Sequence, residues 1–215
     1  MSAPFQLVLL TAPTAQPNES PMLAELLAQD LGRLHLRKPG WTAAQLEELI
    51  HALPPQFYPR LVLHAYPQLV RQYQLGGLHL TERARAAARR RPTLLPGQTL
   101  STSFHSLAEI SQHRRRYDYV FLSPIFDSLS KKGYASNFDL GDLRRFFQAQ
   151  AARPGYRPPV LALGGIEARN ISLTQQAGFA GAAVLGAVWQ SADPVAAWRQ
   201  VAQASAASQS FHTGS

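Results

Sequence analysis

The sequence predicts a single α/β domain with the (β/α)8 TIM-barrel fold, and three observations lead to this prediction. Eight short apolar runs of the kind that form buried strands recur along the chain. A segment with helical patterning or a helix-start signal follows each run. The length of 215 residues is ordinary for one barrel domain. An open doubly wound sheet also uses buried parallel strands, and the count of eight favours the barrel.

The eight predicted strands alternate with eight predicted helices from one end of the chain to the other. The strands are residues 5–11, 33–37, 60–64, 77–80, 98–103, 117–123, 159–165 and 180–186. The helical segments begin near Pro21, Thr42, Pro67, Glu82, Leu107, Asp139, Ala168 and Asp193. Capping signals support two of these starts, Thr42 followed by Gln45 and Asp193 directly before Pro194. We place the barrel domain at residues 1–205 and a disordered tail, small and polar, at residues 206–215.

Composition excludes several classes of protein. The chain is 46% hydrophobic, which excludes a disordered protein, and it has no cysteine, which excludes disulfides, thiolate zinc sites and cysteine nucleophiles. The apolar run from Phe5 to Leu10 is too short to span a bilayer and lacks the positive flank of a signal peptide. We therefore expect a cytoplasmic protein without a membrane partner.

The formal net charge of +8 is concentrated in two arginine clusters. Neither cluster has the interleaved aromatic residues with which proteins stack on bases, so we expect a solvated surface and no nucleic-acid partner. The clusters are Arg83, Arg85, Arg89, Arg90 and Arg91, and Arg114, Arg115 and Arg116.

Polar residues fall at the ends of several predicted strands, where barrel enzymes carry their catalytic groups. Strand alternation places His35 and Arg37 on one face, opposite two leucines that suit the helix layer. The same parity aligns Ser101, Ser103 and His105. Histidine suits proton transfer near neutral pH. The candidate acid/base residues are His35, His64, His79 and His105.

Two glycine-rich turns and one long loop predict a phosphate site. Gly164 and Gly165 follow the seventh strand and Gly186 follows the eighth, where barrels often bind phosphate through backbone N–H groups. The long sixth loop supplies hydroxyls and an ammonium group suited to a phosphate or pyrophosphate. The candidate substrate-binding and phosphate-binding residues are Arg37, Lys38, Ser103, Ser128, Ser130, Lys131, Gly164, Gly165 and Gly186.

Six motifs carry a resemblance to a known family. In order they are LHLRKPG, GLHLTE, STSFHS, DYVFLSPIFDSLSKKGY, VLALGGI and GFAGAAVLGAVW. Together they resemble the thiamine phosphate synthase/TenI family from about residue 5 to residue 200. The resemblance implies a (β/α)8 barrel and thiamine biosynthesis. Synthases of this family join a pyrimidine pyrophosphate to a thiazole phosphate with Mg²⁺, whereas the TenI branch isomerises a thiazole phosphate and needs no metal.

The match to the family is uneven. Arg37, Ser103 and the glycines of the last two turns match, and Ser128, Ser130 and Lys131 match the sixth-loop pattern in kind. Where the synthases carry their first magnesium aspartate, this chain has Ala65, and the second would fall near Ala84. The position of the TenI catalytic histidine is Pro124. The phosphate-binding half is therefore present, and the magnesium half is missing.

Three functions follow as alternatives. The first is a TenI-like thiazole tautomerase that uses the rim histidines and needs no metal or other cofactor. The second is a synthase with a rearranged magnesium site, using Glu82 or Asp127, that also takes pyrimidine pyrophosphate. The third is a non-catalytic thiazole-phosphate binder. The oligomeric state stays open, with a homo-oligomer among the alternatives.

Overall fold

The strands form a closed, parallel eight-stranded barrel, as predicted. The computed structural model describes residues 4–29, 31–127 and 138–210. The strands follow one another around the barrel in chain order, from β1 to β8. They are β1 (Gln6–Leu10), β2 (Leu34–Leu36), β3 (Leu61–Leu63), β4 (Gly77–Leu80), β5 (Thr99–Phe104), β6 (Tyr119–Leu122), β7 (Val160–Leu163) and β8 (Gly181–Val184).

Helices alternate with these strands, which confirms the α/β pattern. They are α1 (Glu19–Ala28), α2 (Ala43–His51), α3 (Pro67–Gln72), α4 (Glu82–Ala87), α5 (Leu107–Gln112), α6 (Leu140–Ala151), α7 (Ile171–Ala177), α8 (Gly186–Trp189) and α9 (Pro194–Ser210), with a 3₁₀ helix η1 at Pro55–Arg60. The predicted cap of α2 is present, because the Thr42 side chain accepts a hydrogen bond from the Gln45 backbone N–H and the Gln45 side chain accepts one from Thr42.

Two details differ from the sequence prediction. The sequence predicts a glycine-rich turn at Gly186, whereas the residues after β8 form the short helix α8. The predicted tail begins too early, because α9 continues to Ser210. Trp198, Val201 and Ser205 of α9 are buried at a spacing of three or four residues. One face of this helix is therefore packed against the protein as far as residue 205, the predicted end of the domain.

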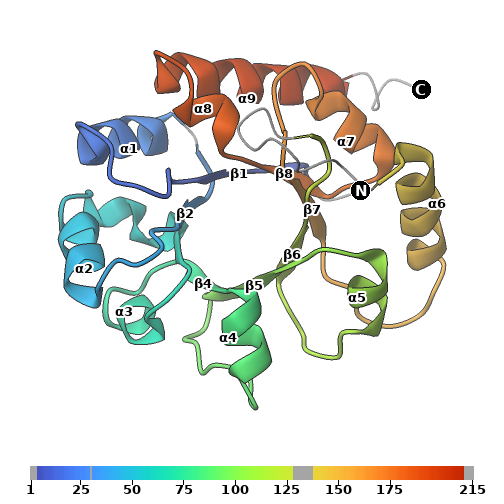
Figure 1. Ribbon diagram of the computed structural model, residues 1–215, viewed down its shortest axis with the longest axis horizontal. Helices are drawn as coiled ribbons and strands as arrows, with labels where there is room; N and C mark the ends of the chain where they lie inside the picture. The colour runs from blue at the N-terminus through green and yellow to red at the C-terminus, as the bar shows by residue number, and fades with distance from the viewer. Residues whose placement is uncertain (1–3, 30, 128–137, 211–215) are drawn as a thin grey trace. The chain divides into compact units, whose positions relative to one another are not determined.

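The chain divides into two compact units. The N-terminal unit is residues 8–103, and the C-terminal unit is residues 1–7 with 104–215. Within the N-terminal unit, α1 to α4 lie outside the strands that they follow (Figure 1). Helix α1 buries Leu23, Leu26 and Leu27, the three- and four-residue spacing of a helix with one apolar face.

The C-terminal unit has an aromatic core between two of its helices. Phe147 of α6 meets Phe179, which follows α7, edge-to-face with ring centroids 4.8 Å apart. Gly178 ends α7 with a φ of +95°, and an added Cβ there would lie 3.3 Å from the Phe147 Cβ. The glycine therefore permits both the helix end and the close approach of the ring.

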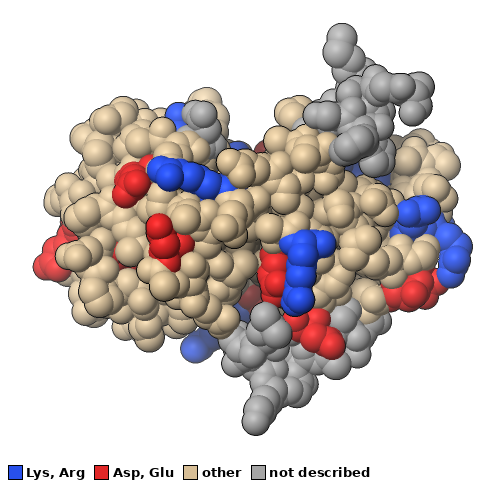
Figure 2. All heavy atoms as spheres, turned by 90° about the horizontal axis from the view of Figure 1, so that it is seen from above, with Lys and Arg blue, Asp and Glu red and all other residues tan. Residues whose placement is uncertain are grey.

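The arginine-rich segment after β4 is less helical than the sequence suggests. Helix α4 ends at Ala87, so Arg89, Arg90 and Arg91 lie beyond it and are exposed. On the face drawn in Figure 2, Lys and Arg atoms are interspersed with Asp and Glu atoms. Among the described helices, none has the length and hydropathy needed to cross a membrane.

Candidate functional site

Three histidines of the N-terminal unit come together at neighbouring strands. His35 is the middle residue of β2, His64 directly follows β3, and His79 lies in β4. The parallel register pairs His35 with Val62, and Leu63 with Leu78. Continued by one residue, this register places His64 directly opposite His79 and two positions beyond the partner of His35. One ring nitrogen from each histidine lies within 4.8 Å of the other two. We call these three residues the histidine cluster.

The rings contact one another directly. Nδ1 of His35 lies 3.0 Å from Nε2 of His64, which is a hydrogen bond. The His64 and His79 rings stack with centroids 4.2 Å apart and planes 26° apart. His35 and His79 meet edge-to-face at 5.5 Å. The cluster is thus a packed unit in which moving one imidazole requires moving the others.

Two serines of β5 hold His79. Its Nδ1 lies 2.9 Å from the hydroxyl of Ser101, the residue directly opposite in the strand register, and its Nε2 lies 3.1 Å from the hydroxyl of Ser103. A hydroxyl both donates and accepts, so either tautomer of His79 satisfies both contacts. Both serines therefore lie on the face of the histidines, as strand parity predicts for Ser101 and Ser103.

Burial sets the protonation state of the cluster. His35 is 0% and His79 is 2% exposed, while His64 is half-buried. Loss of hydration lowers the pKa of His35 and of His64 well below its usual value, with smaller contributions from neighbouring histidines and arginines. Burial, followed by the charges of Arg37 and Arg85, lowers the pKa of His79 to about 3. All three imidazoles are therefore neutral at pH 7.

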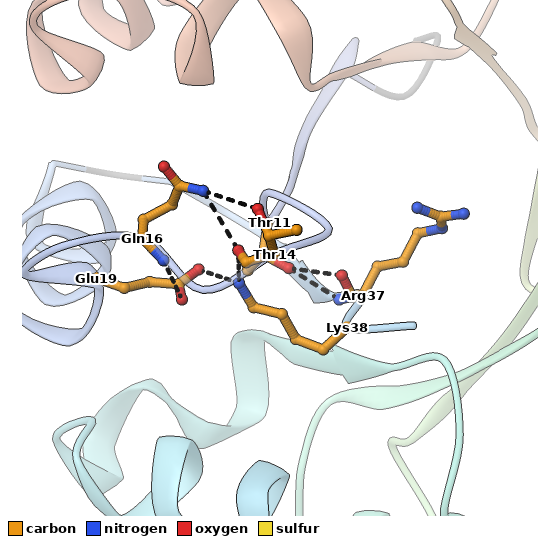
Figure 3. A network of polar contacts seen from close by, with 6 residues as sticks. All are labelled: Thr11, Thr14, Gln16, Glu19, Arg37 and Lys38. Carbon is orange, nitrogen blue, oxygen red and sulfur yellow. Dashed lines mark hydrogen bonds and ion pairs between the residues drawn. The ribbon is translucent and has the colours of Figure 1, made fainter. Parts of the chain in front are cut away.

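Arg37 supplies a positive charge beside the neutral cluster. Its backbone is fixed at Thr11, whose hydroxyl accepts from the Arg37 N–H at 2.9 Å and donates to the Arg37 carbonyl at 3.2 Å. The guanidinium extends away from these contacts (Figure 3). Its charge lowers the pKa of both His64 and His79, which places it near them. No carboxylate partner of this guanidinium occurs among the described residues, so the charge is available to an anion.

Lys38 is held inside the protein in a different way. Its ammonium group is buried, forms an ion pair with Glu19 and donates to the Thr14 carbonyl at 2.8 Å (Figure 3). Glu19 in turn accepts from the Gln16 backbone N–H at 3.4 Å. The pair ties the segment after β2 to the start of α1. A substrate-binding role for Lys38 stays a prediction, because this ammonium already has a charged partner.

Three imidazole nitrogens at this spacing could coordinate a transition metal such as Zn²⁺. Two features oppose a metal here. The stacked rings of His64 and His79 do not direct their in-plane lone pairs at one point. The cations that act on the cluster, including Arg37 and Arg85, repel a further cation.

The residues do not fit Mg²⁺ either, since that ion is usually held by carboxylates. The positions that match the magnesium aspartates of the resembled synthases are Ala65 and Ala84. Glu82 is exposed in the first turn of α4, and Asp127 is exposed in the C-terminal unit. The electrostatics of the cluster therefore favour an anion over a metal ion.

The C-terminal unit contains the glycine turns. Gly164 and Gly165 follow β7 with φ values of +97° and +64°. A Cβ on Gly165 would lie 2.7 Å from the Asp127 carbonyl oxygen, so only glycine fits this approach. The turn is fixed by Asn170, whose amide donates to the Gly165 carbonyl at 2.8 Å.

Gly186 lies beside this turn, because Leu163 of β7 pairs with Ala183 of β8. Among the described residues, no acceptor is recorded for the backbone N–H of Gly165 or of Gly186. Two such groups next to each other are suited to the oxygen atoms of a phosphate.

His105 does not belong to the histidine cluster. The chain leaves β5 at Phe104, and the exposed ring of His105 lies 3.0 Å from the Ser123 carbonyl through Nδ1. The loop residues Ser128, Ser130 and Lys131 lie outside the described residues. The sequence did not identify Glu19 or Ser101 as site residues, although Ser101 shares the parity of Ser103.

Comparisons with known proteins add a family relationship. A family model described as thiamine monophosphate synthase matches residues 7–188. The thiamine-phosphate synthase of Desulfitobacterium hafniense strain DCB-2 is 28% identical over 149 residues, which are 69% of each chain. That of Chloroflexus aurantiacus is 36% identical over 117 residues, 54% of this chain and 50% of its own.

Solved structures agree. Thiamine phosphate pyrophosphorylase from Bacteroides thetaiotaomicron superposes with a TM-score of 0.78 at 28% identity, covering 94% of this chain and 98% of that one. The protein of the same name from Pyrococcus furiosus gives a TM-score of 0.72 at 19% identity, covering 95% and 96%, and shows the likeness of fold.

Proposed function

Because the chain belongs to the thiamine monophosphate synthase family, we propose that it is a thiazole phosphate tautomerase of thiamine biosynthesis that works without a metal ion. The observation that carries this proposal is the neutral histidine cluster beside Arg37, whose guanidinium has no carboxylate partner among the described residues. The chain has acid/base groups and an anion-binding cation in the unit where the resembled synthases hold Mg²⁺.

Tautomerisation moves one proton from one carbon to another and changes neither the oxidation state nor the atoms of the molecule. It therefore requires one group that takes the proton and returns it. His64 suits this role because it is the half-buried member of the cluster. If its Nε2–H donates to Nδ1 of His35, its own Nδ1 carries a lone pair that accepts the substrate proton.

The neighbours of His64 control that step. When His64 gains a proton it becomes an imidazolium in a buried, positively charged environment, which favours rapid return of the proton. A bound substrate with a negative phosphate raises the pKa of His64 and makes the first transfer easier. His35 acts as a positioning residue, because its hydrogen bond fixes which nitrogen of His64 is basic.

Arg37, in the same unit as the histidine cluster, binds the negative charge of the substrate. The backbone N–H groups of Gly165 and Gly186 stay a predicted phosphate site of the C-terminal unit. The predicted roles of Ser103, Lys38 and the sixth-loop residues Ser128, Ser130 and Lys131 are retained as proposals. Among these, Ser103 has the clearest support, since it contacts His79.

The names of the relatives favour a second candidate, an authentic synthase that uses Mg²⁺ and pyrimidine pyrophosphate. The alanines at positions 65 and 84 oppose it, since carboxylates usually hold Mg²⁺ next to substrate phosphates. A non-catalytic binder shares the phosphate site with the tautomerase and differs from it only in lacking turnover.

Two parallel reactions separate the three candidates. The protein is incubated with a non-aromatic thiazole phosphate tautomer in EDTA, and conversion to the aromatic form is followed by mass-resolved chromatography. We expect conversion in EDTA, a loss of about 100-fold or more in His64→Asn, and no change in His51→Gln, which lies on α2 outside the cluster.

A parallel reaction contains aromatic thiazole phosphate, pyrimidine pyrophosphate and Mg²⁺. Formation of thiamine phosphate there, abolished by EDTA, would overturn the tautomerase in favour of the synthase. Substrate binding without conversion in either reaction would leave the binder.

A further inference from the structure

A cavity lies in the C-terminal unit, at the amino ends of its strands. Its volume is about 320 Å³. Its walls include residues 114–116 directly before β6, residues 156–159 directly before β7, and Gly178 and Ala180 before β8. The glycine turns follow the carboxyl ends of β7 and β8, so the cavity is distinct from the proposed phosphate site.

The wall of this cavity is strongly basic. Its described lining residues include Arg114, Arg115, Arg116 and Arg157 and no aspartate or glutamate. Arg157 donates to two backbone carbonyls, those of Gln150 at 3.2 Å and Pro154 at 3.4 Å. Among the described residues, no carboxylate partner is recorded for Arg114, Arg116 or Arg157. Their charges attract an anion and repel a cation.

An aromatic surface accompanies the arginines. Phe146 and Phe147 of α6 are half-buried in the wall, and Tyr156 is 48% exposed. The Tyr156 hydroxyl donates to the Tyr117 carbonyl, which fixes the ring. The guanidinium of Arg116 lies 5.3 Å from the centroid of that ring. An exposed ring held in place beside a cation offers one face to a planar group and one charge to an anion.

We infer that this cavity is a binding site for a mononucleotide. The base packs on the aromatic wall, and the phosphate binds Arg114 and Arg116. Nucleotides combine a flat ring with an anion, which is the combination that these residues present. A cavity of 320 Å³ is at the lower end of the usual range for small-molecule sites, which suits one nucleotide.

The site is tested by isothermal titration with AMP, GMP and CMP, and with adenosine and inorganic phosphate as partial ligands. We expect a mononucleotide to bind at least about tenfold more tightly than either partial ligand, because only the whole molecule uses both walls. Arg116→Ala is expected to weaken binding about tenfold, because it removes a charge-assisted contact. Tyr156→Leu tests the ring separately.

Arg153→Ala is the matched control, since Arg153 follows α6 and does not line the cavity. It should bind mononucleotides like the unmodified protein, and all variants should convert thiazole phosphate normally.

No binding of any mononucleotide at millimolar concentration would overturn the inference. So would binding that Arg116→Ala and Tyr156→Leu leave unchanged, or phosphate binding as tight as nucleotide binding. Tighter, steeply salt-dependent binding of single-stranded DNA would instead assign the surface to nucleic acid. None of these outcomes depends on turnover of thiazole phosphate.

Discussion

The Nδ1 atom of His35 and the Nε2 atom of His64 share one proton across 3.0 Å. Because both imidazoles are neutral at pH 7, the tautomer of one determines the tautomer of the other. His35 is fully buried, so we expect it to influence turnover through its neighbours and not by contact with substrate.

The two histidines should consequently behave as one unit in kinetics. We expect His35→Asn to lower kcat while leaving KM within about twofold, since the substrate contacts are unchanged. The double variant with His64→Asn should be no slower than His64→Asn alone. Steady-state kinetics of the single and double variants measure this coupling. If the kcat loss of the double variant were the product of the two single losses, the shared-proton arrangement would be contradicted.

Acid should unfold the protein through the same cluster. A histidine whose pKa is lowered in the folded state contributes its full stability above pH 6.5, and loses it as the pH falls from 6.5 toward the folded pKa. For His79, with a folded pKa of about 3, the free energy of unfolding should fall by about 1.4 kcal/mol per pH unit in this range. Urea unfolding at pH 7.0, 6.0, 5.0 and 4.5 measures the slope. His79→Gln should reduce that slope by the contribution of one bound proton. An unchanged slope would show that His79 does not take up a proton on unfolding.

The Lys38–Glu19 ion pair should be costly to break on one side only. Lys38→Met leaves the Glu19 carboxylate buried without its partner, and we expect a loss of about 3–5 kcal/mol in the free energy of unfolding. The double variant Lys38→Met, Glu19→Leu should recover most of the loss. The control is Arg145→Ala, because the Arg145–Asp142 pair is 74% and 62% exposed and should cost about 1 kcal/mol or less. Equal losses for Lys38→Met and Arg145→Ala would disprove the structural importance of the buried pair.

Replacing Gly165 should damage the turn after β7, which we propose as a phosphate site, more than its backbone angle alone requires. Gly165→Ala adds a Cβ that meets the Asp127 carbonyl oxygen at 2.7 Å and the Phe126 carbonyl oxygen at 2.8 Å, so the turn must shift. Gly97 has a φ of +85° and open space around it, so Gly97→Ala costs only about 1–2 kcal/mol for its conformation. Equilibrium dialysis with thiazole phosphate should show weaker binding only in Gly165→Ala. Comparable affinity in both variants would remove the turn from the binding site.

Much of the fold was predictable because its signals are local. The apolar runs that form strands and the cap at Thr42 depend on residues a few positions apart. Strand alternation also predicted that His35 shares a face with Arg37, since side-chain direction follows from parity. For His64 and His79, their places at or near strand ends were sufficient to predict that they lie close together. Parallel strands in register bring such ends side by side.

The remaining contacts depend on tertiary structure. Parity aligned His105 with Ser103, but the strand ends at Phe104 and the His105 ring lies against the Ser123 carbonyl. Glu19 has no sequence signal that pairs it with Lys38, because the two are 19 residues apart and meet only when α1 packs beside β2. Within the described part of the chain, Lys38 has a carboxylate partner and Arg37 has none. The sequence does not distinguish the two residues, because they are adjacent cations.

The two serines beside His79 have a consequence for proton movement. Each serine hydroxyl can rotate, and each lies within hydrogen-bonding distance of a different ring nitrogen. A proton that arrives on one side of the imidazole can therefore leave from the other while every heavy atom stays in place. His79, although enclosed, is therefore the middle member of a hydrogen-bonded chain that runs from Ser101 to Ser103.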